Sequence, residues 1–91
     1  MVTEKGAEFN KVYWASRRGM LELDLVLMPF AKSAYPSLSE ENQARYRHLL
    51  EQEDQDLFAW FLGHRQAPSV ELAGMVEQVI AFSANSRQGT D

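Results

Sequence analysis

The sequence predicts an all-α fold, a compact five-helix bundle that forms a single domain over residues 1–91. Apolar residues recur at three- and four-residue steps in five segments, which is the spacing of a buried helix face. Glycine or proline separates most of these segments, and both residues interrupt helices. The chain contains no cysteine. Disulfides and thiolate metal sites are therefore excluded, and helix packing must supply the stability.

The first predicted helix covers Asn10–Arg18. Its inward side consists of Phe9, Val12, Tyr13 and Ser16. Gly19 is a natural stop, because glycine tolerates the left-handed conformation in which many helices end. We expect residues 1–7 and 86–91 to be flexible ends of the domain.

The second predicted helix, Met20–Ala34, also has a strand-like feature, because leucines alternate at positions 21, 23, 25 and 27. A lone strand among helices would have no partner to pair with, so we favour a helix. Its apolar face consists of Met20, Leu23, Leu27, Phe30 and Ala34, widened by Leu21, Leu25 and Met28. Pro29 removes a hydrogen bond inside this helix and should kink it.

Three further helices are predicted after Tyr35-Pro36-Ser37. One is capped by Ser37 or Ser39 and runs to about Gln52. The next, Asp54–Leu62, would be capped by Asp54 and followed by Gly63. The last begins after Ser69 and runs from Val70 to about Ala84. The expected inward residues of the three are Leu38, Tyr46, Leu49, Leu50, Leu57, Phe58, Trp60, Phe61, Leu72, Met75, Val76, Val79 and Phe82.

The net charge of −4 argues against nucleic-acid binding, because contacts to phosphates need a basic surface. No apolar run approaches the roughly 20 residues of a membrane-spanning helix, and no hydrophobic signal segment begins the chain. We therefore expect a cytoplasmic protein without direct membrane insertion. His48 and His64 are the only histidines. Neither has convincing partners in the sequence, so we predict no metal site and no catalytic residues.

The densest cluster of candidate functional residues is residues 17–24, here called the charged corner. Its sequence is Arg17-Arg18-Gly19-Met20-Leu21-Glu22-Leu23-Asp24. The arginines would lie at the end of the first helix and the acids at the start of the second, where the helix dipoles favour each charge. Asp24 falls within the apolar arc of the second helix, so its carboxylate needs a partner.

Two interpretations of the charged corner follow from the residues. In the structural one, Asp24 pairs with an arginine, and the charges only stabilise two helix ends. In the functional one, the corner is rigid and binds a partner protein, for which arginine is suited because its planar group makes paired contacts to carboxylates. The candidate partner-binding residues are Arg17, Arg18, Gly19, Met20, Glu22 and Asp24.

Residues 18–22, Arg-Gly-Met-Leu-Glu, resemble the Arg-Gly-x-x-Glu signature of the succinate dehydrogenase assembly factor family, also called the flavinylation factor family. Flanking motifs resemble the family in order and spacing. They are Tyr13-Trp14-Ala15-Ser16-Arg17, Met28-Pro29-Phe30, Leu49-Leu50-Glu51 and the segment 54–60. The resemblance covers roughly residues 9–64. Gln55 departs from the proline that many members have, which should affect only a turn.

The resemblance implies a five-helix assembly factor and not an enzyme. Such a factor binds the flavoprotein subunit of succinate dehydrogenase, and in bacteria often that of fumarate reductase, and promotes the covalent bond between FAD and a histidine of that subunit. FAD would then be attached to the client. We expect no tight FAD binding by this chain alone, because it has no Gly-rich phosphate loop. An antitoxin-like role, in which the protein binds a small membrane-associated toxin, stays open as the alternative function.

Trp14 and Trp60 are expected to be packing residues, although either would become a candidate anchor for a partner if it were exposed beside Arg18. Four acids form a run at the junction of the third and fourth predicted helices, namely Glu51, Glu53, Asp54 and Asp56. We interpret them as a solvated turn. The alternative is that they contact basic residues of the client.

Overall fold

The computed structural model describes residues 4–88, which form five α-helices and no strand. The helices are α1 (Glu4–Ala15), α2 (Leu21–Pro29), α3 (Glu40–Leu50), α4 (Asp54–Phe61) and α5 (Val70–Gln88). α2 continues directly into a π-helical turn, η1 (Phe30–Ala34), and a 3-10 turn, η2 (Tyr35–Ser37). The Cα radius of gyration is 12.8 Å, near the value of about 12 Å for a compact chain of this length. The predicted all-α bundle is confirmed.

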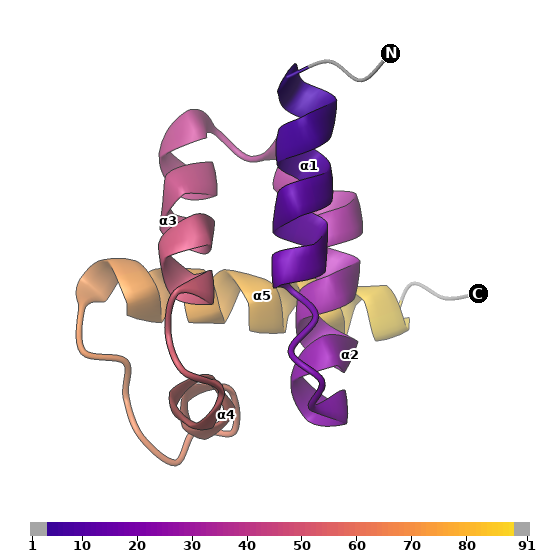
Figure 1. Ribbon diagram of the computed structural model, residues 1–91. Helices are drawn as coiled ribbons and strands as arrows, with labels where there is room; N and C mark the ends of the chain where they lie inside the picture. Colours follow the sequence, from indigo (N-terminus) through magenta and orange to yellow (C-terminus); the bar gives the residue numbers. More distant parts are fainter. Residues whose placement is uncertain (1–3, 89–91) are drawn as a thin grey trace.

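The longest helix, α5, lies across the others. In Figure 1, α1 and α3 stand roughly upright, and α5 crosses behind them. α5 contacts α2, α3, α4 and η1, while α1 packs on η1. In the part of the chain from residue 4 to residue 88, no helix combines the length and the apolar character needed to cross a bilayer.

The end of α1 differs from the prediction, because this helix stops at Ala15 and not at Arg18. The amides of Ser16 and Arg17 still bond to carbonyls of α1. The amide of Arg18 instead donates to Asp24 Oδ1 at 2.7 Å, and this contact takes the chain out of α1. Gly19 therefore does not cap α1. It lies immediately before Met20, the N-cap residue of α2, with φ at +80°.

Both terminal helices are longer than predicted. α1 begins at Glu4, six residues before the expected start at Asn10, and α5 continues to Gln88, beyond the expected end near Ala84. The helices thus take in residues 4–7 and 86–88, which the sequence assigned to flexible ends. The remainder of those ends, residues 1–3 and 89–91, lies outside the described residues.

The leucine alternation in α2 has a helical explanation. Leu23 and Leu27 are four residues apart on the inner face and are 1% and 0% exposed. Leu21 and Leu25 are 68% and 62% exposed, so the expectation that they widen the buried face was wrong. The strand alternative is excluded, because Leu21–Pro29 is helical.

Pro29 is the last residue of α2, but the chain stays helical beyond it with a different winding. Proline has no N–H to donate, and its ring crowds the carbonyl four residues earlier. The next turn is wider, with the amide of Tyr35 bonding to the carbonyl of Phe30, five residues back. This π-turn still points Phe30 and Tyr35 into the core.

The caps of the other helices follow the sequence more closely. Ser39 caps α3 by accepting the amide of Asn42 at 3.2 Å, and Ser69 caps α5 by accepting the amide of Leu72 at 3.1 Å. Gly63 has φ at +78°. Its amide and that of His64 bond back to the carbonyls of Trp60 and Ala59, which is the pattern of a helix end closed by a left-handed glycine.

The core includes a small buried polar cluster, formed by the hydroxyls of Ser16 and Tyr46, among its apolar side chains. The main apolar members are Val12, Leu23, Leu27, Phe30, Tyr35, Tyr46, Leu49, Leu57, Trp60, Leu72, Met75, Val76 and Val79. The hydroxyl of Tyr46 lies 2.7 Å from Ser16 Oγ and donates to the carbonyl of Leu27 at 3.2 Å. Because buried polar groups need partners, this contact fixes α3 against α1 and α2.

Tyr46 should make stability depend on alkaline pH. Burial raises the pKa of Tyr46 above its usual 10.0, so the folded state favours the neutral phenol. This contribution is complete below about pH 10 and is lost as the pH rises towards the folded pKa. We expect the free energy of unfolding to fall above pH 10, and to fall less in Tyr46→Phe, which should lose about 1 kcal/mol at neutral pH. Urea unfolding between pH 7 and 11 measures both effects, and equal slopes for the two proteins would contradict the assignment.

Candidate functional site

The charged corner connects α1 to α2 and includes the first turn of α2. Its turn depends on Gly19, whose φ of +80° is a conformation that other residues rarely adopt. A Cβ atom placed on Gly19 would meet nothing within 4 Å. The requirement for glycine inside the folded chain is therefore conformational, and the space above its Cα is open to a partner.

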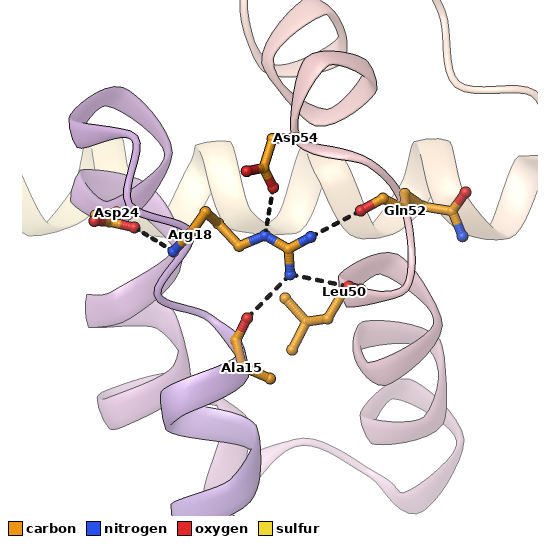
Figure 2. A network of polar contacts seen from close by, with 6 residues as sticks. All are labelled: Ala15, Arg18, Asp24, Leu50, Gln52 and Asp54. Carbon is orange, nitrogen blue, oxygen red and sulfur yellow. Dashed lines mark hydrogen bonds and ion pairs between the residues drawn. The ribbon is translucent and has the colours of Figure 1, made fainter.

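The side chain of Arg18 points back into the molecule and is only 15% exposed. Its Nε donates to Asp54 Oδ1 at 2.8 Å. Nη1 donates to the carbonyls of Ala15 at 3.0 Å and Leu50 at 2.9 Å, and Nη2 donates to that of Gln52 at 2.8 Å. We call these four hydrogen bonds the Arg18 clamp (Figure 2).

The Arg18 clamp joins the ends of three helices. Ala15 and Leu50 are the last residues of α1 and α3, where carbonyls lack helical partners and the dipole is negative. A cation that donates to these carbonyls stabilises both ends. Asp54 is the first residue of α4, where an anion is favoured. One guanidinium therefore fixes the positions of α1, α3 and α4 relative to each other.

Asp24 has a different partner from the one predicted. The sequence suggested an ion pair between Asp24 and an arginine side chain, but its Oδ1 accepts the backbone amide of Arg18 at 2.7 Å. The guanidinium instead lies among the three carbonyls and Asp54 (Figure 2). Asp24 thereby holds the corner to α2. Arg18 thus contacts four helices: its amide bonds to α2, and its side chain bonds to α1, α3 and α4. The half-buried carboxylate is satisfied, as its place in the apolar arc required.

The six predicted partner-binding residues divide into two groups. Arg18, Met20 and Asp24 are partly buried and serve the fold, and Met20 packs against the core. Arg17, Gly19 and Glu22 are exposed. Within residues 4–88, the side chains of Arg17 and Glu22 form no hydrogen bond or ion pair with the protein. These two charges and the open face of Gly19 are what the corner offers to another molecule.

Asp54 is a residue of the Arg18 clamp whose role was not predicted from the sequence. The predicted cap of α4 by Asp54 was wrong, because the N-cap is Glu53 and makes no side-chain cap bond. The carboxylate of Asp54 is held by Arg18, 36 residues away in the chain. Asp56 likewise pairs with Arg65 at 2.6 Å, so part of the acidic run is bound within the protein. The sequence signal for the pairing of Arg18 with Asp54 was weak: a basic residue lies at one predicted helix junction and an acidic residue at another.

The two tryptophans have different environments. Trp60 is 7% exposed and belongs to the core, as predicted, whereas Trp14 is 60% exposed. Trp14 lies in the last turn of α1, and its carbonyl accepts the amide of Arg17. It is thus a candidate anchor beside the charged corner, because large aromatic side chains often dominate binding interfaces.

The two histidines lie outside the charged corner. His48 and His64 are exposed, and the ring of His48 lies 3.1 Å from a carboxylate oxygen of Glu51. Among the described residues, no three His, Cys, Asp or Glu side chains come together as metal ligands could. The corner combines a rigid backbone, two unpaired charges of opposite sign and an exposed aromatic ring.

A family model, related sequences and a solved structure all match most of this chain. The model of a family described as flavinator of succinate dehydrogenase matches residues 10–83. The FAD assembly factor SdhE of Pseudomonas aeruginosa is 49% identical over 73 residues, which cover 80% of this chain and 87% of the relative. That of Shewanella oneidensis is 54% identical over 69 residues, covering 76% and 84%. The solution structure of a UPF0350 protein superposes with a TM-score of 0.70 at 42% identity, covering 98% of this chain and 93% of that one.

The Arg18 clamp predicts that a lysine cannot replace Arg18. Lysine retains the charge but lacks the planar group that reaches Asp54 and three carbonyls together. We expect Arg18→Lys to lower the free energy of unfolding by about 2 kcal/mol, since hydrogen bonds to charged groups contribute roughly 1.5–3 kcal/mol. Urea denaturation measures the loss. Arg17→Lys is the matched control and should change stability by less than about 0.5 kcal/mol; equal effects of the two substitutions would rule out the clamp.

Proposed function

Because the chain belongs to the family of flavinators of succinate dehydrogenase, we propose that it binds the flavoprotein subunit of succinate dehydrogenase and promotes covalent attachment of FAD to that subunit. The chain is an assembly factor and not an enzyme, in keeping with the names of its relatives. We also propose that the protein acts in the cytoplasm. The flavoprotein subunit of fumarate reductase is proposed as a second client.

The observation that carries this proposal is the outward face of the charged corner. Gly19 leaves open space above its Cα, while Arg17 and Glu22 are exposed on either side of it in the sequence. An exposed backbone turn without a Cβ atom, set between two unpaired charges, can approach another protein closely and fix its orientation through ion pairs. Partner binding through this face uses Arg17, Gly19 and Glu22 directly, and Arg18, Met20 and Asp24 by holding them in place.

The proposed mechanism needs no chemistry from this chain. A binding partner shifts a conformational equilibrium only by binding one state better than the other. If the corner binds the flavoprotein conformation in which histidine and flavin are aligned, alignment alone lowers the barrier substantially. A corner held by the Arg18 clamp is already ordered before binding, so little entropy is lost in the complex.

FAD in this scheme belongs to the client throughout. The chain supplies the surface that stabilises the competent client, and we propose that it does not bind free FAD tightly. Titration of the purified protein into FAD, followed by flavin fluorescence, measures this directly. Tight binding in the absence of the flavoprotein would require a different mechanism.

Bulk at position 19 should abolish function without unfolding the protein. Gly19→Ala and Gly19→Arg both force a side chain into the left-handed conformation, which costs roughly 1–2 kcal/mol. Only arginine also fills the open space that the partner needs. We expect Gly19→Arg to leave the flavoprotein with little covalent FAD and Gly19→Ala to retain most of it, at similar melting temperatures. Normal covalent FAD with a folded Gly19→Arg variant would falsify the proposed contact.

Cells that lack this protein test the function as a whole. The dehydrogenase flavoprotein should lose most of its ultraviolet-fluorescent covalent flavin and regain it when the protein is supplied again. A pull-down with the tagged full chain should recover the flavoprotein subunit. Unchanged covalent flavin, together with recovery of a small membrane protein, would instead favour the antitoxin-like alternative.

A further inference from the structure

A shallow groove lies between α2, α4 and α5, on the side of α2 that carries Glu22. Its volume is about 210 Å³. The apolar residues that line it are Leu23, Val26, Phe58, Phe61, Leu62 and Ile80. We call it the α2–α4–α5 groove.

The groove leaves apolar surface uncovered. Leu62 is 51% exposed and Ile80 is 42% exposed, although both contribute to its wall. Exposed apolar surface gathered around a depression, in contrast to scattered exposed residues, marks an interaction site. The groove is also continuous with the charged corner, because Glu22 forms part of its rim.

Glu22 gives the groove its charge. Its carboxylate is exposed and has no protein partner among residues 4–88. It therefore differs from the corner's other acid, Asp24, which is bound to the amide of Arg18. An unpaired carboxylate at the edge of an apolar depression is complementary to an apolar side chain that has a lysine or arginine next to it.

The size of the groove limits what can occupy it. Pockets for small molecules usually have volumes of about 300–1,000 Å³, so this groove is too small for a dinucleotide such as FAD. A single apolar side chain of a partner protein is the right scale, and such anchors often fill small pockets at the centre of an interface.

We propose that the α2–α4–α5 groove receives an apolar side chain of the flavoprotein subunit, and that a neighbouring basic residue of that subunit pairs with Glu22. This inference rests on the proposed function and extends its binding surface from the charged corner across α2 to α4 and α5. The corner then orients the client, while the groove supplies apolar contact area.

Glutamine substitutions test the groove without adding charge. Ile80→Gln should weaken binding of the full chain to the purified flavoprotein subunit by about tenfold, the loss expected for one anchor contact of roughly 1.4 kcal/mol. Val70→Gln is the matched control, because Val70 lies on the same helix, is 85% exposed and is about 15 Å from Ile80 along the axis. It should bind within about twofold of the unmodified protein. Isothermal titration calorimetry gives the affinities, and circular dichroism confirms folding.

Glu22→Gln tests the charge. It should weaken binding at low salt and reduce the dependence of affinity on salt concentration, because one ion pair is lost. If Ile80→Gln does not fold, Leu62→Gln replaces it, since Leu62 lies just after α4 and is more exposed.

The outcomes of these experiments distinguish a failure of the groove proposal from a failure of the proposed function. Unchanged affinity in folded Ile80→Gln or Leu62→Gln, with binding lost in Gly19→Arg, overturns the groove and leaves the proposed function standing. An unchanged salt dependence in Glu22→Gln overturns the assigned ion pair. Failure of the unmodified chain to bind the flavoprotein at all overturns both proposals.

Discussion

The fold around the site depends on where the guanidinium of Arg18 points. A cation on a turn between two helices is ordinarily solvated, but here three carbonyls and Asp54 surround it. These bonds satisfy the ends of α1 and α3 and fix the start of α4. Asp24, through the Arg18 amide, adds α2 to the same junction. In a chain without disulfides and with a small core, one residue that joins four helices strongly constrains the structure.

The inward direction of the Arg18 side chain also separates the buried from the exposed residues of the charged corner. Of the Arg-Gly-x-x-Glu signature, the arginine acts within the protein, while the glycine and the glutamate lie on its surface. The structural interpretation of the charged corner holds in a modified form, with Asp24 bound to the Arg18 amide and the guanidinium bound to helix ends, while partner binding by the exposed residues stays a prediction. In the proposed complex, the clamp would hold the corner in one conformation and the exposed residues would make the contact, so loss of either would impair binding for a different physical reason.

Local patterns predicted the helices well, and tertiary contacts explain where they did not. Spacing and punctuating residues identified five helices, including the Ser39 cap as one of two candidates and the left-handed Gly63 after α4. The early end of α1 was not predictable, because the acceptor that takes the Arg18 amide lies in the next helix. The pairing of Arg18 with Asp54 spans 36 residues, and no local pattern reports it. Leu21 and Leu25 were assigned to the buried face because their side chains are apolar, although at about 3.6 residues per turn both lie on the side of α2 that faces away from Leu23 and Leu27.

Arg18 serves the fold through the clamp, and in the proposed complex it should remain in the clamp. Hydrogen exchange of the Arg18 Nε–H, followed by NMR in the free protein and in its complex with the flavoprotein, tests it most directly. The Nε–H bonded to Asp54 should exchange slowly in both states, while that of Arg17 should exchange rapidly in the free protein. Rapid exchange at Arg18 in the free protein, or its release from Asp54 on binding, would contradict the account.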